Sequence, residues 1–394
     1  MTRRGYYHNS YTRDFPARVV ELTSVGGRPA AILEETYFYP TSGGQPHDTG
    51  RIGGAGVTEV LVRETDGAVL HLLESALPAG DMPAAIDWPR RFDHMQQHTG
   101  QHILSRAFIR AADATTIGFH LGADSVTIDL DNASLRDSVI ADAQEIANQV
   151  VSDNLEVRAW FPTDDELAAL ALRKTPEVDG PLRVVAIGDF DHNACGGTHV
   201  ARTGEIGGIA ILRTERMKRG TRVEFLSGGR AHADYARKHR IVRELAGTLS
   251  CLPGELIESV ERLQRQAQEM RKELAVYREA ELDTEAAELV ARAPTAGARR
   301  IVLKAWADRP IEEVRGLVAR VTSAPGIVML AGVAGARAQI VFGRSEDVAL
   351  DLKPAFDGAL SALGGGRGGG GRVLQGAAGA ADLAAVERAL AAAK

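Results

Sequence analysis

The chain has 394 residues, of which 44% are hydrophobic and 25% charged, a composition typical of a soluble globular protein with roughly two or three domains. These values exclude a collagen, a mucin-like stalk, a wholly disordered chain and a disulfide-stapled miniprotein. The sequence has no run of about 18 apolar residues that could span a bilayer, and its N-terminus lacks the apolar core of a secretory signal. We therefore expect a cytoplasmic protein without a membrane partner.

The formal net charge of −6 is unevenly distributed along the chain. Residues 295–394 hold 13 Lys or Arg against 9 Asp or Glu, which leaves a net charge of −10 for the first 294 residues. A polyanion would therefore meet local basic patches rather than a positive field over the whole protein. The cysteines, Cys195 and Cys251, are too few for a disulfide framework, so each is interpreted as a core residue, a metal ligand or a nucleophile.

Residues 1–87 are expected to form a small β-rich domain. Short runs of β-branched and apolar residues alternate there with glycine clusters such as Ser42-Gly43-Gly44. The predicted strands cover residues 17–22, 30–33, 57–62 and 69–73.

Residues 88–229 are expected to form an α+β domain. Asp87 and Pro89 are typical of a helix N-terminus, and the apolar residues after them recur at helical spacing, which predicts a helix over 89–110. A second, amphipathic helix is predicted over 135–153, with Ser134 as its N-cap. The predicted strands cover residues 126–130, 184–187, 209–213 and 221–226.

Residues 230–293 are expected to form a helical linker, either one long helix or a helical hairpin. Apolar residues recur in it at steps of three and four: Ile257, Val260, Leu263, Ala267, Met270 and Leu274. This pattern fits a solvated spacer that also makes a homodimer, and it fits equally a helix that contacts RNA.

Residues 294–394 are expected to form a small α/β domain, which is the other segment through which a homodimer could form. Predicted strands cover 301–303, 327–331 and 338–342, and a final helix covers 381–392. Between them lies a glycine-rich tract, 364–371, which we interpret as a loop.

Two short motifs carry the chemistry of the sequence. The motif His98-Thr99-Gly100-Gln101-His102 lies within the predicted helix, and Cys195-Gly196-Gly197-Thr198-His199 follows a predicted strand. Helical residues four apart project from one face, about 6 Å apart, and the two glycines let the later segment turn around the same ion. Three imidazoles and one thiolate favour tetrahedral Zn²⁺, so His98, His102, Cys195 and His199 are the predicted ligands. The fold class is thus α+β: a β-rich domain, a zinc-containing α+β domain, a helical linker and a small α/β domain.

The residues near the two motifs do not point to other ligands or to protease chemistry. His94 is rotated by about 80° from His102 on the helix, which favours a supporting or surface role over ligation. The H-E-x-x-H signature of metalloproteases is absent, which disfavours peptide hydrolysis. Cys251, beside Leu252-Pro253, is interpreted as structural.

Four protein ligands are typical of structural zinc, whereas catalytic zinc keeps a position open for water or substrate. Two resolutions remain open. The ion could expand its coordination or release a ligand, or it could organise the pocket while neighbouring polar groups guide an attacking water.

Three blocks occur in order along the chain: residues 38–46, which include Ser42-Gly43-Gly44-Gln45, residues 90–102 and residues 195–199. Together they resemble the editing domain of alanyl-tRNA synthetase and, more closely, the free-standing AlaX-type editing proteins. The helical segment and the glycine-rich tract resemble the linker and the C-terminal tRNA-binding domain of the same synthetase. The resemblance covers nearly the whole chain, as in the long form of AlaX.

This resemblance implies hydrolysis of the ester that joins serine or glycine to the 3′-terminal adenosine of tRNA(Ala), while Ala-tRNA(Ala) is spared. The pocket in which a synthetase attaches alanine to tRNA cannot easily exclude glycine or serine on size. A second, hydrolytic pocket that recognises the hydroxyl would remove serine that has been attached in error. The family's two histidine motifs bind zinc, which maps onto the four ligands named above.

The resemblance also assigns residues around the predicted ion. It implies that Gln45 orients substrate or water, that Ser42, Gly43 and Gly44 cover the pocket, and that Thr36 favours a seryl hydroxyl. Gln101 stands where many synthetases have threonine before the second histidine. Residues 118–122 fit either a pocket wall that offers His120 to the substrate or the end of a structural strand.

Two basic segments are candidates for contact with tRNA. Residues 213–222 hold five positive charges and one negative charge around a predicted hairpin, and these positive residues are Arg213, Arg216, Lys218, Arg219 and Arg222. They fit salt-sensitive phosphate contacts or a merely solvated turn. Arg367 and Arg372 flank or interrupt the glycine tract, which fits a phosphate cradle or a flexible loop. The tract does not match the P-loop motif, so ATP binding is unsupported.

Three functions compete on this sequence. The preferred one is a zinc-dependent trans-editing hydrolase. The second is a non-catalytic, zinc-stabilised tRNA-binding protein. The third, a ligase, would require a class II aminoacylation domain upstream, and we expect none because the editing-like blocks begin within the first 40 residues.

Overall fold

The computed structural model describes residues 2–173, 181–297 and 299–394, which form a mixed α+β fold with several sheets. The chain divides into two compact units, Met1–Leu245 and Ala246–Lys394. The division into four segments at 87, 229 and 293 stays a prediction. Within the described ranges, no helix combines the length and apolar composition needed to cross a membrane.

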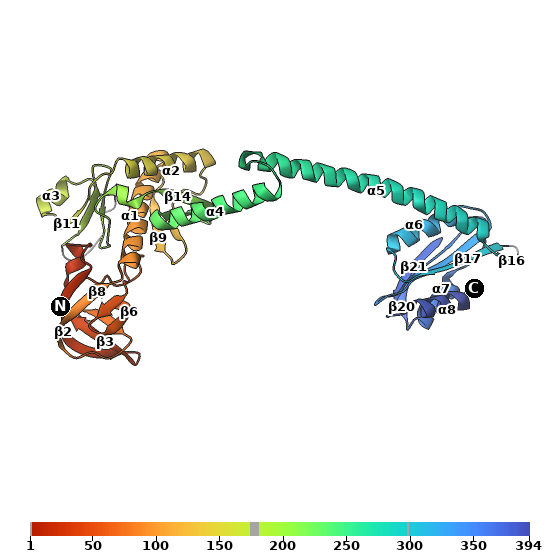
Figure 1. Cartoon of the computed structure of the whole chain (residues 1–394), viewed down its shortest axis with the longest axis horizontal. Helices are drawn as coiled ribbons and strands as arrows, with labels where there is room; N and C mark the ends of the chain where they lie inside the picture. The colour runs from red at the N-terminus through yellow and green to blue at the C-terminus, as the bar shows by residue number, and fades with distance from the viewer. Residues whose placement is uncertain (1, 174–180, 298) are drawn as a thin grey trace. The chain divides into compact units, whose positions relative to one another are not determined.

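The first unit begins with a closed antiparallel barrel (Figure 1). Its strands pair in the order β2-β3-β7-β6-β5-β8. Their bounds are β2 (Asp14–Val25), β3 (Arg28–Leu33), β5 (Gly50–Ile52), β6 (Ala55–Val62), β7 (Val69–Leu73) and β8 (Gly80–Ile86). The predicted strands lie within these, but the closure does not follow from periodicity. Leu33, Phe38, Val60 and Val69 pack in the barrel core.

Small elements lie on either side of the β2–β3 hairpin. They lead into the segment between β4 (Glu35–Thr36) and β5, which we call the barrel loop. The strand β1 (Arg3–Arg4) pairs in parallel with β4, and the 3₁₀ turn η1 (Gly5–Tyr7) follows β1. The segment between β4 and β5 contains residues 38–46, the first block of the resemblance.

The helix α1 (Trp88–Ala112) follows the barrel and is the central element of the first unit. Asp87 caps it by accepting a hydrogen bond from the backbone N–H of Arg90, and Pro89 lies in the first turn, as predicted. The helix ends at Asp113, whose φ of 51° is left-handed. Apolar side chains such as Met95, Ile103 and Phe108 bury one side of α1 in the unit's main core.

An antiparallel sheet and a second helix complete that core. The sheet has the order β14-β15-β10-β9, with bounds β9 (Thr116–Leu121), β10 (Val126–Leu130), β14 (Ile209–Met217) and β15 (Gly220–Ser227). The N-cap residue of the helix α2 (Asp137–Ser152) is Arg136, whose side chain makes no cap hydrogen bond, so the prediction of Ser134 as N-cap is wrong. The backbone N–H of Ser134 instead bonds the side chain of Asn132 in a local turn, and the chain becomes helical only after it.

A third group of strands positions the second motif. The order is β11-β12-β13, and all its neighbours are antiparallel. The bounds are β11 (Val157–Trp160), β12 (Val184–Ile187) and β13 (Asp191–Ala194), with α3 (Asp164–Ala169) before β12 and η2 (Thr203–Ile206) after β13. The Cys195–His199 segment therefore leaves directly from the end of β13.

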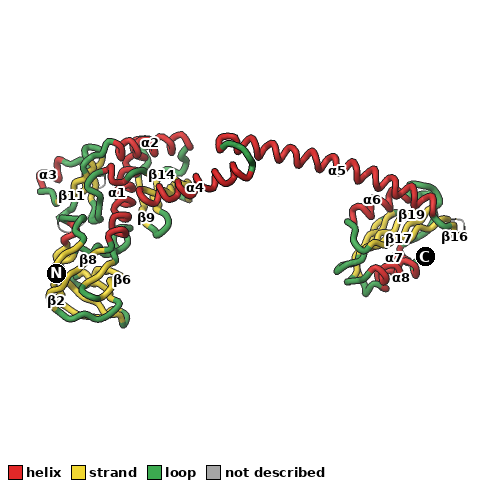
Figure 2. The backbone as a smooth tube through the Cα atoms, in the orientation of Figure 1, coloured by secondary structure: helices red, strands yellow, loops and turns green. Residues whose placement is uncertain are grey.

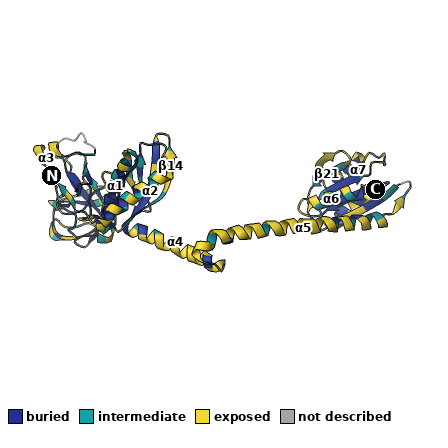
Figure 3. Ribbon diagram, turned by 90° about the horizontal axis from the view of Figure 1, so that it is seen from above, coloured by how far each residue is buried: buried dark blue, intermediate teal, exposed yellow. Residues whose placement is uncertain are grey.

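The predicted helical segment 230–293 is present as two helices rather than one. They are α4 (Gly228–Thr248) and α5 (Leu256–Arg292), separated by the 3₁₀ turn η3 (Pro253–Glu255). Figure 3 shows that α5 is exposed along most of its length. Its last turns are an exception, because Leu282 and Ala286 pack into the second unit.

The second unit is a sheet with helices on both faces (Figure 2). The order is β16-β17-β18-β19-β21-β20. The bounds are β16 (Thr295–Ala296), β17 (Arg299–Trp306), α6 (Ile311–Val321), β18 (Ile327–Val333), β19 (Gln339–Arg344), α7 (Lys353–Ala362), β20 (Gly366–Gly370), β21 (Val373–Ala378) and α8 (Leu383–Ala392).

Alternation along the central strands divides this unit into two cores. Leu330 and Phe342 face α7 and α8, whereas Met329 and Val341 face α6 and the end of α5. Successive strand residues point to opposite faces, so continuous apolar strands serve both helical layers.

The glycine-rich tract is an edge strand, so its interpretation as a loop is wrong. β20 pairs with β21 from Gly366 to Gly370. A Cβ added to Gly368 would lie 2.4 Å from the carbonyl oxygen of Gln375 and 2.9 Å from the ring of Phe356. Glycine is required there because α7 lies against the hairpin, and sequence composition did not reveal this packing.

Candidate metal centre

Two of the predicted ligands project from the middle of α1. His98 and His102 are one helical turn apart, and both are buried, with 4% and 2% of their surface exposed. Gly100 lies between them because α1 passes close to the end of β15, where a Cβ would meet Oγ of Ser227 at 2.1 Å. The small residue in the first motif therefore lets the helix pack against the sheet.

The other two ligands lie in the turn after β13. A Cβ at Gly197 would lie 2.2 Å from the ring of His98, so glycine is needed for the turn to approach α1. Arg183, only 6% exposed, donates to the backbone carbonyls of Cys195 at 2.8 Å and Gly197 at 2.9 Å. This buried guanidinium holds the turn in place.

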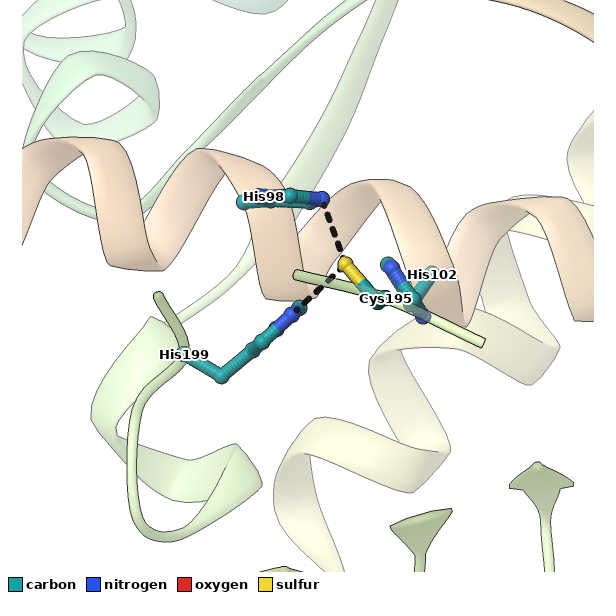
Figure 4. Close-up of side chains that lie close together, drawn as sticks. All are labelled: His98, His102, Cys195 and His199. Atoms are coloured by element: carbon teal, nitrogen blue, oxygen red, sulfur yellow. Dashed lines mark hydrogen bonds between the residues drawn. The ribbon is translucent and has the colours of Figure 1, made fainter. Parts of the chain in front are cut away.

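All four predicted ligands come together. One ligand atom from each of His98, His102, Cys195 and His199 lies within 4.8 Å of the others, an arrangement that could hold a metal ion. The Sγ atom of Cys195 lies 3.4 Å from Nε2 of His98 and 3.3 Å from Nε2 of His199. Figure 4 shows the sulfur between these two rings, with His102 from the next turn of α1 beside it.

The pKa shifts differ between members of this group. Burial lowers the pKa of His102, but Cys195 and Asp191 outweigh it and raise that pKa above its usual value. Burial raises the pKa of the Cys195 thiol, but the charges of His98, His199 and His102 outweigh it and hold that pKa well below its usual value. Burial lowers the pKa of His199 to about 3, against an opposing effect of Cys195, which keeps this ring neutral. A thiolate and neutral imidazoles are the forms that coordinate metal.

Two of the imidazoles are held from behind by polar side chains. Nδ1 of His98 donates to Oε1 of Gln45 at 2.7 Å, and Nδ1 of His199 lies 3.1 Å from Oγ1 of Thr99. In both rings Nε2 is left facing the sulfur. Partners of this kind fix the tautomer and orientation of a metal-binding imidazole.

Gln45 is fixed in turn by the second motif. Its Nε2 donates to Oγ1 of Thr198 at 2.8 Å, and its Oε1 also accepts from the backbone N–H of Thr198 at 3.2 Å. The glutamine is fully buried and all its polar contacts lie behind the imidazoles. The structure therefore places Gln45 against His98, outside the residues that line the pocket described below, and its role in orienting substrate stays a prediction.

The first block of the resemblance is a tight turn that directs Gln45 inwards. Ser42 and Gln45 exchange backbone hydrogen bonds, and the φ angles of Gly43 and Gly44 are 57° and 83°. Two successive left-handed residues are characteristic of a type I′ turn, which explains the paired glycines. Gly44 also packs against Phe119, where a Cβ would lie 2.8 Å from the ring.

A buried ion pair fastens the same segment to α1. Arg91 is fully buried and its Nε lies 3.0 Å and 3.1 Å from the two carboxylate oxygens of Asp48. It also donates to the backbone carbonyls of Ser10 and Tyr37, and Asp48 accepts from the backbone N–H of Tyr39. The ion pair thus fixes the position of the barrel loop relative to α1, the helix that carries the histidines.

A pocket of about 630 Å³ opens onto this cluster. Its walls include His98, His102 and Cys195, the rim residues Ser42 and Gly43, and polar groups from α1, β9 and β13. The additional lining residues include Gln101, Thr116, Phe119, Arg173 and Asn193. Phe119 stacks on His98, with ring centroids 5.3 Å apart. A pocket that combines apolar walls with polar and metal-binding groups is suited to a small polar substrate.

Other residues expected in the pocket lie elsewhere. His120 is exposed and outside the lining, whereas the residues before it on β9, up to Phe119, line the pocket. Thr36 is fully buried, 2.7 Å from Nε2 of His71, and accepts from the backbone N–H of Phe38. His94 is buried outside the ligand cluster.

The basic residues of the first unit lie on the β14–β15 hairpin. Arg213 pairs with Glu224 and Arg222 with Asp129, so both are partly neutralised. Arg216, Lys218 and Arg219 are exposed. In the second unit, Arg367 is exposed on β20 and Arg372 follows it, 3.7 Å from Glu346.

Sequence reasoning missed residues that act around the cluster. Asp191 and Arg173 lie beside His102, Arg183 holds the turn, and Phe119 stacks on His98. Burial raises the pKa of Asp191, but His102, Arg173 and Arg106 outweigh it and hold that pKa below its usual value. The one available signal was the nearness of Asp191 to the second motif, and it does not distinguish Asp191 from Asp189.

Two relatives match most of the chain. It is 32% identical over 294 residues to the Pyrococcus horikoshii protein named alanyl-tRNA editing protein AlaX-L, covering 70% of this chain and 72% of the relative. It is 33% identical over 282 residues to the Mus musculus protein named alanyl-tRNA editing protein Aarsd1, covering 67% and 68%. The chain belongs to the alanyl-tRNA editing protein family.

A domain match covers part of this editing-family chain. The model described as the threonyl and alanyl tRNA synthetase second additional domain matches residues 182–224, which include Asp191, Cys195 and His199. The solved C-Ala domain of alanyl-tRNA synthetase from Aquifex aeolicus matches 26% of this chain and 96% of that domain, with 21% identity and a TM-score of 0.23.

Proposed function

We propose that the chain is a zinc-dependent trans-editing hydrolase that deacylates Ser-tRNA(Ala) and also Gly-tRNA(Ala) and spares Ala-tRNA(Ala). The observation that carries this proposal is the convergence of three imidazoles and one thiol, of which His98, His102 and Cys195 lie on the wall of the pocket. The names of the relatives, alanyl-tRNA editing proteins, support the same activity.

The donor set fits Zn²⁺. One sulfur and three nitrogens are the ligand types that zinc prefers, and the four atoms are already close together in a buried site. His98, His102, Cys195 and His199 would hold the ion. When bound, it would supply Lewis acidity next to the ester carbonyl or lower the pKa of a water molecule.

The residues around the centre would divide the remaining tasks. Gln45 and Thr99 orient His98 and His199 through their Nδ1 atoms. Ser42 and Gly43 form the rim over which the acylated adenosine enters. Gln101 lines the pocket between the two helical histidines, and its Nε2 already donates to Ser105, which leaves its carbonyl oxygen as an acceptor for the substrate.

We assign Thr36 an indirect role in selecting the amino acid. Its hydroxyl is bonded to His71 and to the start of the loop at Phe38, so it supports the segment that leads to Ser42. His120 is exposed and does not line the pocket, so its contact with the substrate stays a prediction. To cleave Ser-tRNA(Ala) and spare Ala-tRNA(Ala), the pocket needs a contact that only the serine hydroxyl makes. A difference in size between the two amino acids would by itself give weak discrimination.

We propose that tRNA(Ala) also contacts exposed basic groups away from the pocket. Among the described residues, no carboxylate forms an ion pair with Arg216, Lys218 or Arg219, so their charges are available to phosphates. Arg213 and Arg222 would contribute less because each has a carboxylate partner. Arg367 and Arg372 are candidates in the second unit. Affinity for tRNA should fall steeply with added salt.

We propose further that two copies of the chain associate through α5. Val260, Met270 and Tyr277 are 43%, 62% and 73% exposed although they belong to one apolar stripe. The stripe alternates steps of three and four as the a and d positions of heptads do, and its members are Val260, Leu263, Ala267, Met270, Leu274 and Tyr277. In this register Glu273 and Arg278 occupy g and e positions that pair across a parallel two-stranded coiled coil.

A deacylation panel tests the activity. Purified protein loaded with Zn²⁺ is incubated with Ser-, Gly- and Ala-tRNA(Ala), and the remaining ester is measured. We expect loss of the first two and survival of the third. Cys195→Ala should lose metal and activity together, whereas the matched variant Cys251→Ala, at a cysteine away from the centre, should keep both.

The alternatives give different results in the same panel. A zinc-stabilised tRNA-binding protein would retain tRNA without turnover and would lose its fold on chelation. A ligase would charge tRNA in the presence of ATP and alanine. Intact Ser-tRNA(Ala) after incubation with zinc-loaded protein would overturn the proposed hydrolase.

A further inference from the structure

His102 differs from the other two imidazoles because its second nitrogen has no neutral partner. Its Nδ1 is buried and, within the described part of the chain, makes no hydrogen bond. The nearest carboxylate is that of Asp191, whose Oδ2 lies 3.8 Å from Nδ1. Both carboxylate oxygens of Asp191 are likewise buried and without a hydrogen bond among the described residues. A buried ring nitrogen and a buried carboxylate, both without a hydrogen bond among the described residues, therefore lie near each other.

Burying these two polar groups without hydrogen bonds lowers the stability of the folded protein. The His102 side chain is 2% exposed and that of Asp191 is 1% exposed, so both lie away from bulk water. A buried polar atom without a partner costs about 1–3 kcal/mol, and more when it is charged. Because β13 begins at Asp191 and its backbone is fixed by pairing with Ile187, the carboxylate is held at this point by the sheet.

A cation also lies beside the same carboxylate oxygen. Nη1 of Arg173 lies 3.7 Å from Oδ2 of Asp191 and donates to the backbone carbonyl of His102 at 3.3 Å. The backbone N–H of Arg173 also donates to the carbonyl of His192, next to Asp191. Arg173 thus joins the chain around Asp191 to the turn of α1 that carries His102.

We propose that Asp191 is the positioning residue of His102: its carboxylate keeps the ring proton on Nδ1 and so leaves Nε2 free for the metal centre. Asp191 then does for His102 what Gln45 and Thr99 do for His98 and His199. The inference rests on the proposed metal centre, but it does not depend on which ester the protein cleaves. An anionic acceptor also makes His102 a stronger donor to the metal than a neutral acceptor would.

Zinc affinity provides the first test. Competition with a chromophoric chelator is measured for the full chain and for Asp191→Ala and Asp191→Asn. We expect Asp191→Ala to weaken zinc binding by about 10- to 100-fold. Asp191→Asn should lose less, because its amide oxygen can still accept from Nδ1. The control is Asp189→Asn, at an exposed carboxylate two residues away, which should bind zinc as the unsubstituted protein does.

A second measurement needs no variant and covers the case in which Asp191→Ala fails to fold. Long-range ¹H–¹⁵N spectra of the zinc-loaded protein with labelled histidine report which ring nitrogen carries the proton. We expect the proton of His102 on Nδ1. A proton on Nε2, or unchanged zinc affinity in a folded Asp191→Ala, would overturn the proposal.

Neither measurement uses tRNA. A failure of the Asp191 proposal is therefore distinguishable from a failure of the proposed deacylase activity, which the ester panel reports by itself.

Discussion

Nδ1 of His98 donates a hydrogen bond to the side-chain oxygen of Gln45 at 2.7 Å, which links the turn of the barrel loop to the helix of the metal centre. Gln45→Ala should therefore weaken zinc binding by about 10- to 100-fold, because it removes the group that fixes the tautomer of His98. Equilibrium competition with a chelator measures the loss. Gln149→Ala, on the exposed face of α2, is the control. If Gln45→Ala binds zinc normally and only its deacylation rate falls, Gln45 acts on the substrate instead.

The buried pair of Arg91 and Asp48 should dominate the stability of the first unit. Arg91→Met should lower the free energy of unfolding by about 3–5 kcal/mol, since it leaves the Asp48 carboxylate buried without its cation. Denaturant unfolding measures the change. Arg222→Met breaks an exposed pair and should have little effect. The double variant Arg91→Met, Asp48→Leu should recover part of the loss, and if it is as unstable as Arg91→Met alone, the unpaired charge is not the cause.

The barrel should lose stability in mild acid through His71. Burial lowers the pKa of His71 from 6.5 to about 4, against an opposing hydrogen bond to the carbonyl of Ala31. Below pH 6.5 the His71 side chain is protonated in the unfolded chain, whereas in the native barrel it is protonated only below about pH 4. The stability due to neutral His71 is thus complete above pH 6.5 and is lost as the pH falls to 4, by about 3 kcal/mol.

Unfolding free energies at a series of pH values test this assignment. His71→Gln should remove this part of the pH dependence, whereas His239→Gln, at an exposed position on α4, should retain it. Equal slopes for His71→Gln and the unsubstituted protein would show that another group is responsible.

The apolar stripe of α5 predicts a concentration-dependent dimer. Met270→Glu places a charge at its centre and should shift the protein to monomer in sedimentation velocity experiments. Lys272→Glu changes a charge on the opposite side of the same helix and should leave the dimer intact. A monomer in the unsubstituted protein at every accessible concentration would contradict the proposed association.

The edge strand β20 offers a matched pair of glycines. Gly368→Ala should destabilise the second unit by about 1–3 kcal/mol, because the new Cβ meets the Gln375 carbonyl and the Phe356 ring. At Gly369 a Cβ meets nothing within 4 Å, so Gly369→Ala should be nearly neutral. Thermal unfolding of the full chain compares the two. Equal stabilities would mean that the tract is not held as an edge strand.

Sequence patterns predicted those elements whose signals are local. The strand 126–130 and the strand 184–187 have the bounds of β10 and β12, and the Asp87 cap with Pro89 located the start of α1 within a residue. The two motifs also predicted which four side chains come together, because a helical turn and a glycine turn fix their local geometry. That they bind zinc stays a prediction.

The remaining features depend on contacts between distant segments. The barrel closes through the pairing of β2 with β8, which periodicity does not encode. β20 is a strand because Phe356 and β21 lie beside it, although its composition is typical of a loop. Gln45 was expected at the substrate and lies behind His98, since the inward direction of its side chain depends on a turn that packs on Phe119.

The centre draws on segments far apart in the chain: Gln45 is 53 residues from His98, and Cys195 is 97 residues beyond it. During synthesis a nascent chain cannot close this site until His199 has left the ribosome. Metal capture of the kind proposed here would thus be a late event in the synthesis of the first unit, and chains truncated before Cys195 would lack two of the four proposed ligands.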